Sequence, residues 1–212
     1  MSEVQTRERL SRLSASLFQR GYAVGSAGNI SVRLDDGFLI TPTNSCLGFL
    51  DPAKISKLDR EGRHIAGDPP SKEIFLHSAF YETRPGTGAV VHLHSTNATA
   101  LSCLSDTKPE DAIPPLTPYV VMRVGAVRLL PYFRPGDPAM GQAIRELRGR
   151  CAAVLLANHG TVVAAQSLEA AVFAAEELEE TAKLVLLLSN RNHQLLTTDQ
   201  VEDLRRVFGT PS

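Results

Sequence analysis

Two histidines lie two residues apart in the apolar run Ala89-Val90-Val91-His92-Leu93-His94. The run predicts a β-strand, and since side chains alternate between the faces of a strand, His92 and His94 point the same way. Two imidazoles on one face can bind one metal ion, because neutral imidazole nitrogen suits zinc and its divalent neighbours. Two ligands do not make a site, so a pair of hydrogen-bonded histidines beside the core fits this run equally well.

A third histidine favours the metal hypothesis. The continuous apolar run 152–157 predicts a strand buried on both faces, and it ends in Asn158-His159-Gly160. Three histidine ligands with an open coordination position are the pattern of a catalytic zinc site. The remaining histidines and the cysteines have no comparable setting or ligand spacing: His64, His77, His193, Cys46, Cys103 and Cys151.

Ser71-Lys72-Glu73 opens a predicted helix over residues 72–82, with Ser71 as its N-cap. Free N–H groups and the helix dipole favour anions at such a position, so Ser71 and Lys72 can hold a phosphate or a carboxylate. Glu73 has two interpretations. It is either a first-turn acid that complements the dipole, which the spacing alone favours, or a general acid/base beside a metal.

Two turns are rich in small donors, Gly28-Asn29 and Thr41-Pro42-Thr43-Asn44-Ser45. Such turns can present backbone N–H groups to a phosphate. Simple hairpin connections explain them at least as well when each is taken alone.

These residues need a scaffold, and hydrophobic periodicity predicts one. Helices are expected at residues 3–20, 72–82, 98–104, 137–147, 168–189 and 198–208. Strands are expected at residues 30–34, 38–41, 89–94, 127–131, 152–157 and 161–165, with a second hairpin at 57–65 and a strand or turn near Tyr119. Strands outnumber what alternating βαβ units need, so the pattern indicates an α/β protein with a mixed sheet covered by helices on both faces.

Length and charge limit the class of protein. A length of 212 residues predicts one domain over residues 1–212. A net charge of −1 provides no overall positive potential to attract nucleic acid. The polar start lacks a signal-peptide core, and no apolar run approaches the ~20 residues of a membrane span. Three scattered cysteines are typical of a reducing cytosol, so a cytoplasmic protein is expected.

The motifs in combination resemble the class II aldolase/adducin family. Five strings occur in the family's order and span residues of about 5–190: Gly28-Asn29-Ile30-Ser31, Thr41-Pro42-Thr43, Ser71-Lys72-Glu73, His92-Leu93-His94-Ser95 and Asn158-His159-Gly160. The resemblance implies a three-layer α/β/α fold on a central, largely antiparallel mixed sheet, assembled as a homotetramer. It also implies one Zn²⁺, or another divalent metal, on His92, His94 and His159.

The same resemblance implies roles for further residues. Glu73 would be the acid/base, and a candidate zinc ligand when substrate is absent. Substrate and phosphate would be bound by Gly28, Asn29, Thr43, Asn44, Ser71 and Lys72. The Pro-rich loop 109–118 and Tyr119 are suited to reach a neighbouring subunit, although a plain surface loop explains them equally well.

Two departures separate this chain from the family's sugar-phosphate aldolases. Those enzymes usually carry two small hydroxyl residues before the glutamate, and the second is Lys72 here. They also commonly have a tyrosine near the C-terminus for the aldehyde, whereas the last tyrosine here is Tyr132. The strings Pro-Pro-Ser-Lys-Glu and Pro-Thr-Asn-Ser-Cys look most like the subgroup of 3-oxo-tetronate 4-phosphate decarboxylases, which act in four-carbon sugar-acid breakdown.

The expected reaction is therefore a zinc-dependent decarboxylation that gives dihydroxyacetone phosphate and CO₂ through a metal-stabilised enediolate. Lys72 would then hold a substrate carboxylate or phosphate, or else be a solvated lysine. The first alternative is an aldolase that cleaves a fuculose- or rhamnulose-type ketose 1-phosphate to dihydroxyacetone phosphate and an aldehyde. The second is a non-catalytic adducin-type binding head, which need not retain the three histidines and Glu73 that are present here.

Overall fold

The computed structural model describes residues 2–209 and 211, and it contains one mixed sheet of eight strands in the order β4-β3-β2-β1-β5-β8-β7-β6. Neighbouring strands are antiparallel except β6 and β7, which are parallel. The strands are β1 Asn29–Leu34, β2 Gly37–Ile40, β3 Ser56–Asp59, β4 His64–Ala66, β5 Ala89–Leu93, β6 Val127–Leu130, β7 Ala153–Leu156 and β8 Gly160–Ala165.

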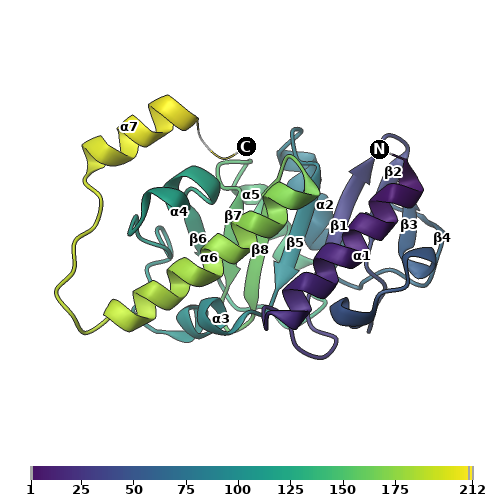
Figure 1. The fold of residues 1–212 in the computed structure, drawn as a ribbon, viewed down its shortest axis with the longest axis horizontal. Coiled ribbons are helices and arrows are strands. Elements are labelled where there is room, and N and C mark those ends of the chain that lie inside the picture. Colours follow the sequence, from purple (N-terminus) through teal and green to yellow (C-terminus); the bar gives the residue numbers. More distant parts are fainter. Residues whose placement is uncertain (1, 210, 212) are drawn as a thin grey trace.

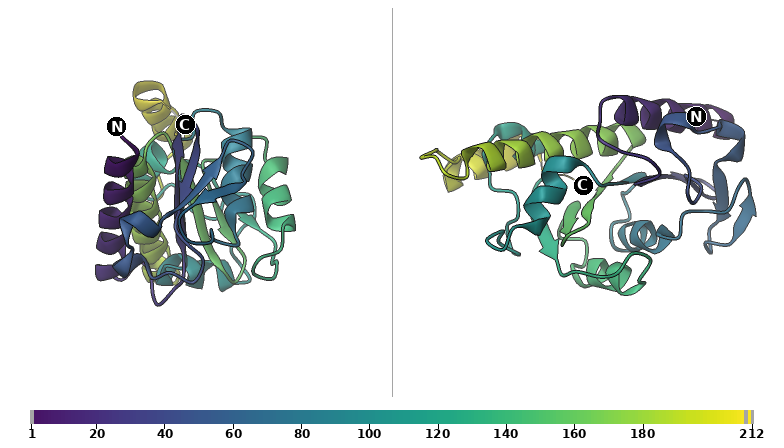
Figure 2. Two further views of the ribbon diagram at one scale, coloured as in Figure 1. Left: turned by 90° about the vertical axis from the view of Figure 1, so that its right-hand side faces the viewer. Right: turned by 90° about the horizontal axis from the view of Figure 1, so that it is seen from below.

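Helices cover both faces of this sheet (Figures 1 and 2). One core contains the apolar sides of α1, α3, α4 and α6, and the opposite core those of α2 and α5. The helices are α1 Glu3–Gln19, α2 Ile74–Thr83, α3 Thr96–Cys103, α4 Pro118–Arg123, α5 Ala139–Glu146, α6 Leu168–Leu188 and α7 Thr198–Phe208, with short 3₁₀ turns η1 Leu47–Phe49 and η2 Pro52–Lys54. The expected three-layer α/β/α fold with a largely antiparallel sheet is confirmed.

The strand β5 lies at the centre of this arrangement. It pairs with β1 on one side, where Asn29 is opposite His92, and with β8 on the other, where Val162 is opposite His92. Val91 and Leu93 face the core beneath α6, and Val90 faces the core beneath α2. The alternation along β5 thus turns His92 to the α2 side, because His92 and Val90 share a face.

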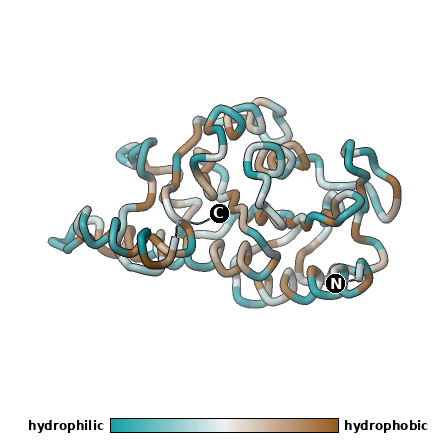
Figure 3. The backbone as a smooth tube through the Cα atoms, turned by 90° about the horizontal axis from the view of Figure 1, so that it is seen from above, coloured by the Kyte–Doolittle hydropathy of each residue, from teal (hydrophilic) through white to brown (hydrophobic). Residues whose placement is uncertain are grey.

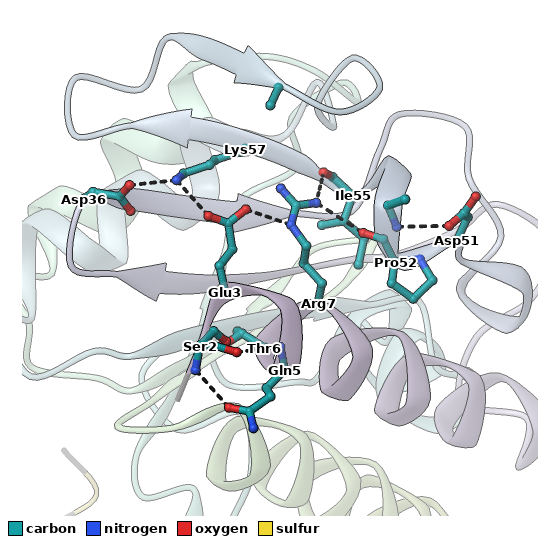
Figure 4. Close-up of polar contacts among 12 residues, drawn as sticks. Ser2, Glu3, Gln5, Thr6, Arg7, Asp36, Asp51, Pro52, Ile55 and Lys57 are labelled. Atoms are coloured by element: carbon teal, nitrogen blue, oxygen red, sulfur yellow. Dashed lines mark hydrogen bonds and ion pairs between the residues drawn. The ribbon is translucent and has the colours of Figure 1, made fainter.

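An ion-pair network fastens the N-terminal helix to the meander β1–β4. The carboxylate of Glu3 bonds both the Arg7 guanidinium and the Lys57 ammonium, each at 2.8 Å (Figure 4). Arg7 also donates to the carbonyl oxygens of Pro52 and Ile55 at 3.2 and 2.6 Å. These contacts tie α1 to η2 and β3, and hence to the half of the sheet that carries Asn29.

An extended segment joins the C-terminal helix α7 to α6, and α7 does not pack on the sheet (Figure 1). The chain leaves α6 through a hydrophilic turn at one end of the molecule (Figure 3). It then returns, and Val201 and Leu204 pack on the edge of the core that includes α4. No helix among residues 2–209 is long and apolar enough to cross a membrane.

Two local expectations were wrong. The segment at Tyr119 is the short helix α4 rather than a strand or turn, because the Thr117 side chain accepts from Val120 N–H and Pro118 occupies the first turn. The helix α2 begins at Ile74, two residues later than predicted. Ser71 does not cap it, since its hydroxyl instead accepts a hydrogen bond from the N–H of Glu73 at 3.3 Å within the preceding turn.

Candidate metal and acid–base site

The three histidines expected to act together do lie together. His92 is fully buried on β5, His94 follows the end of that strand, and His159 lies in the turn from β7 to β8. Their ring centroids are 4.6–5.0 Å apart, and one nitrogen from each ring lies within 4.8 Å of the others. Asn158 adopts a left-handed conformation, with φ of 55°, which lets the tight turn between the two strands carry His159.

The donor set fits a divalent cation. The Nδ1–H of His92 donates to the carbonyl oxygen of Thr161 at 2.7 Å, which leaves the lone pair of Nε2 facing the other two rings. Burial lowers the pKa of His94 to about 3 and that of His159 to about 4. Both rings are therefore neutral near pH 7, as metal ligation requires.

Glu73 completes the cluster. Its Oε2 lies 3.3 Å from Nε2 of His92, and its Oε1 lies 3.6 Å from Nε2 of His159. The amide of Asn29 donates to Oε2 at 2.9 Å. Burial would raise the pKa of the Glu73 carboxyl, but the neighbouring His92 ring and the amide of Asn29 outweigh burial and lower it. Glu73 thus faces the histidines, and a role limited to complementing the helix dipole does not describe its contacts.

Backbone hydrogen bonds bring the two small-donor turns next to this cluster. Thr43 N–H donates to the Pro69 carbonyl at 2.9 Å, and Ser71 N–H donates to the Thr41 carbonyl at 3.3 Å. The Thr41 hydroxyl in turn accepts from the N–H of Ile30 at 3.2 Å, directly after Asn29. The segments 28–30, 41–44 and 69–73 therefore form one continuous rim beside Glu73.

The candidate phosphate-binding residues of that rim differ in their exposure and in the hydrogen bonds that their side chains already make. Asn44 is exposed in a left-handed conformation, and Thr43 is half-buried. The side chain of Asn29 is engaged at both ends of its amide, since its Nδ2 donates to Glu73 and its Oδ1 accepts from His77. Gly28, with φ of +84°, lies so close to β5 that a Cβ would approach the His92 carbonyl oxygen to 2.8 Å.

Lys72 and Tyr119 are both exposed to solvent and make few contacts with the described residues. Lys72 is exposed, and its ammonium makes no hydrogen bond or ion pair with any described residue. Tyr119 lies on α4 with 54% of its surface exposed, and the Arg123 guanidinium lies 5.4 Å from its ring centroid. The structure brings Lys72 to the rim beside Glu73 but does not join Tyr119 to the cluster.

Three supporting residues were not expected from the sequence. His77, which was set aside as a lone histidine, hydrogen-bonds Asn29 from its position four residues after Glu73. The helical spacing of Glu73 and His77 is the signal that could have found it. The Thr161 carbonyl orients His92, and Glu179 on α6 accepts from the N–H groups of Asn97 and Ala98 at 2.8 Å each, just after His94. Sequence spacing gives no signal for either.

Comparison with known proteins agrees with this geometry. The sequence profile of the Class II Aldolase and Adducin N-terminal domain matches residues 8–186. A 3-oxo-tetronate 4-phosphate decarboxylase of Pectobacterium atrosepticum is 53% identical over 204 residues, which cover 96% of this chain and 94% of the relative. The L-fuculose phosphate aldolase of Haemophilus influenzae is 31% identical over 214 residues, which cover 99% of this chain and 96% of that enzyme.

Solved structures share the same fold. The crystal structure of YgbL from Klebsiella pneumoniae, described as a candidate aldolase, epimerase or decarboxylase, superposes with a TM-score of 0.94. It is 51% identical, and the match covers 97% of this chain and all of that one.

Proposed function

Since this chain belongs to the class II aldolase and adducin family, we propose that it decarboxylates a 3-oxo-tetronate 4-phosphate to dihydroxyacetone phosphate and CO₂. The observation that carries the proposal is the 53% identity, over nearly the whole chain, to a decarboxylase of that substrate. The fuculose phosphate aldolase is more distant, at 31%. Decarboxylases and aldolases of this family are both carbon–carbon lyases, so the chain is an enzyme of that class.

We propose that His92, His94 and His159 hold one divalent cation, with zinc as the expected metal. A cation bound there supplies Lewis-acid polarisation of the substrate carbonyl. The three converging nitrogens and the neutral state of the rings support this ligand set. Glu73 borders the same space and is the candidate fourth ligand when substrate is absent.

Glu73 is the proposed acid/base of the reaction. In the substrate, carbon 1 is a carboxylate beside the C2 hydroxyl, and carbon 3 is a ketone. The C1–C2 bond breaks, CO₂ leaves, and the electron pair of that bond forms a C2–C3 enediolate. Glu73, which is ionised at the start, takes up a proton from solvent and passes it to C2, and this leaves the carboxylate ionised again. Its distances of 3.3 and 3.6 Å to the nitrogens of His92 and His159 support this role.

We further propose that the rim binds the anionic ends of the substrate. Gly28, Thr43, Asn44 and Ser71 would surround the phosphate, with Asn29 contributing through its position because its side-chain amide is engaged with Glu73. The unpaired ammonium of Lys72 is the proposed partner of the substrate carboxylate. An aldolase substrate of this family has a phosphate but no carboxylate, so Lys72 is also the residue expected to favour the oxo-acid.

A homotetramer in the cytoplasm completes the proposal. Tyr119 is the candidate contribution to a neighbouring subunit, and its exposure supports that role.

Product analysis tests the reaction. Purified enzyme is incubated with 3-oxo-tetronate 4-phosphate and, separately, with fuculose and rhamnulose 1-phosphates. CO₂ and dihydroxyacetone phosphate are expected from the oxo-acid. Dihydroxyacetone phosphate from the ketose phosphates alone would instead identify an aldolase.

The variant Lys72→Ser tests the carboxylate contact. It should raise KM for the oxo-acid by about 10-fold, the effect of losing about 1.4 kcal/mol from a charge-assisted contact. Lys108→Ser, which changes another exposed lysine, should leave KM unchanged. Equal KM values for both variants would remove Lys72 from the site.

A further inference from the structure

A polar seam joins β1 to α2 beneath the candidate site. Asn29, Ser31 and Arg33 lie at every second position on one face of β1. Glu73 directly precedes α2, and His77 and Tyr81 follow it at every fourth position along that helix. Two strand residues advance about 6.8 Å and four helical residues about 6.0 Å, so the two rows stay in register. The seam contains these contacts: Asn29 Nδ2–Glu73 Oε2 2.9 Å, His77 Nε2–Asn29 Oδ1 2.6 Å, Ser31 Oγ–His77 Nδ1 2.7 Å and Ser31 Oγ–Tyr81 Oη 2.7 Å.

The seam is shut off from solvent. Ser31 and His77 are completely buried, Asn29 is 5% exposed and Tyr81 is 6% exposed. A buried polar group that lacks a partner costs about 1–3 kcal/mol, so each of these side chains must satisfy the next. Once the donor and the acceptor are known in one of these hydrogen bonds, they follow for all the others in the seam.

The carboxylate of Glu73, at one end of the seam, determines which atoms donate. An ionised carboxylate only accepts, so the amide of Asn29 must turn Nδ2 toward Glu73 and Oδ1 toward His77. Since Oδ1 only accepts, Nε2 of His77 must carry the proton. Burial lowers the pKa of His77 to about 3, so this histidine has one ring proton at neutral pH and its Nδ1 is an acceptor.

The Tyr81 end continues in the same direction. The hydroxyl of Ser31 has one proton, which it must donate to Nδ1 of His77. The oxygen of Ser31 then accepts from the Tyr81 phenol, which keeps its proton because burial raises its pKa. The Arg33 guanidinium lies 4.7 Å from the Tyr81 ring centroid and donates to the Tyr81 carbonyl, which closes the far end of the seam.

We propose that His77 is a positioning residue whose Nε2–H tautomer, with Nδ1 accepting from Ser31, holds the Asn29 amide with its donor toward Glu73. The reverse orientation of this amide would put its carbonyl oxygen against the carboxylate and repel it. Glu73 is thereby kept facing the histidine cluster with Oε2 occupied by Asn29. The consequence for turnover rests on the proposed acid/base role of Glu73, whereas the tautomer and the amide orientation do not.

Two substitutions at His77 separate donation from packing. In His77→Gln the amide nitrogen reaches the position of Nε2 and can still donate to Asn29. In His77→Asn the shorter amide reaches only the position of Nδ1, so the contact with Ser31 survives and the donor to Asn29 is lost. His77→Asn should lower kcat about 10–100-fold, the usual effect of removing an orienting partner, with KM changed less than about twofold. His77→Gln should recover most of that loss.

Nuclear magnetic resonance tests the tautomer of His77, and hence the donors along the seam, without measuring turnover. In protein with ¹⁵N-labelled histidine, assigned through the spectrum of His77→Gln, His77 should give the pattern of a neutral ring with a protonated Nε2. A protonated Nδ1 would overturn the proposal, because the whole chain of donors would then run the other way. Equal kcat in the Asn and Gln variants would also overturn it.

Controls separate positioning from stability and from the identity of the reaction. Ser14→Ala removes another fully buried hydroxyl, on α1, and should leave kcat unchanged. A kcat that follows the unfolding midpoint across all three variants would mean a purely structural role. If the wild type cleaves ketose phosphates and not the oxo-acid, the proposed decarboxylation fails, and the His77 series is then measured on the aldol cleavage.

Discussion

At the scale of single residues, Glu73 is the group on which turnover should depend most. Both of its oxygens face histidine rings, and Asn29 fixes one of them. Glu73→Gln keeps the shape of the side chain but cannot exchange a proton, so kcat should fall about 10²–10⁴-fold. Elemental analysis should find the metal retained in this variant and lost in His92→Ala. A near-native kcat in Glu73→Gln would contradict the acid/base role and leave Glu73 only the role of complementing the helix dipole.

The buried His77 should also leave a signature in the pH dependence of stability. Its pKa is lowered from the ordinary 6.5 to about 3 by burial. Below about pH 6.5 the unfolded chain binds a proton that the folded chain refuses, so this contribution to stability is present above pH 6.5 and is lost as the pH falls toward 3.

Urea unfolding of chelator-treated protein between pH 6.5 and 4 measures this effect. Against the wild type, His77→Gln should reduce the slope of the unfolding free energy by up to about 1.4 kcal/mol per pH unit, the value of one proton. His94 and His159 also have lowered pKa values, but they contribute equally to both proteins. Identical slopes would contradict a neutral, buried His77.

Sequence reasoning reached the clustered residues of this site but not those that orient them. The period of two in β5 and the polar end of β7 favoured a cluster of His92, His94 and His159, and the family resemblance assigned all three to one metal. The role of Glu73 stayed open, because spacing cannot show which way a first-turn acid points. His77 was set aside because it lies on a predicted helix, without the strand setting of the other histidines. Its partners Asn29 and Ser31 lie more than forty positions away in the sequence.

At the scale of elements, β5 is held between two glycines that permit close approach. A Cβ on Gly160 would overlap the carbonyl oxygen of Leu93, which lies between His92 and His94, and one on Gly28 would crowd the carbonyl of His92. Gly160→Ala should therefore destabilise the protein by about 1–3 kcal/mol, as overpacking does, and weaken metal binding.

Gly86→Ala is the matched control for that substitution. A Cβ at Gly86 meets no atom within 4 Å, and its φ lies outside the left-handed region. Thermal unfolding and metal titration of the two variants should show an effect for Gly160→Ala alone. An unchanged metal affinity in Gly160→Ala would mean that β5 can move without disturbing its histidines.

Hairpins and amphipathic helices were predictable because their signals are local. The turn between β1 and β2, the turn between β3 and β4 and the long helix α6 all follow from periodicity and turn residues. The placement of β5 between β1 and β8 was not predictable, because those pairings join segments far apart in the chain. The helix α4 was missed since the Pro-rich segment before it gives no helical period, and its start depends on a cap from Thr117.

At the scale of the whole molecule, the described surface includes apolar side chains that a lone chain has no reason to expose. Phe173 is 49% exposed and Phe208 is 61% exposed, and together with Met122 they line one groove formed by α4, α6 and α7. Tyr119, on α4, is 54% exposed. Monomeric proteins rarely expose large contiguous apolar patches, so these residues support the proposed homotetramer.

Light scattering at micromolar concentration should give four times the 22.9 kDa mass of one chain. Because association stabilises only the folded state, the unfolding midpoint should also rise with protein concentration. Identical subunits that each have a net charge of −1 do not attract one another through opposite net charges, so high salt should not dissociate the assembly as it would a charge-driven one. A mass of one chain, together with an unfolding midpoint that does not depend on concentration, would contradict the tetramer. The histidines, Glu73 and the rim all come from one chain, and such a monomer could then still be active.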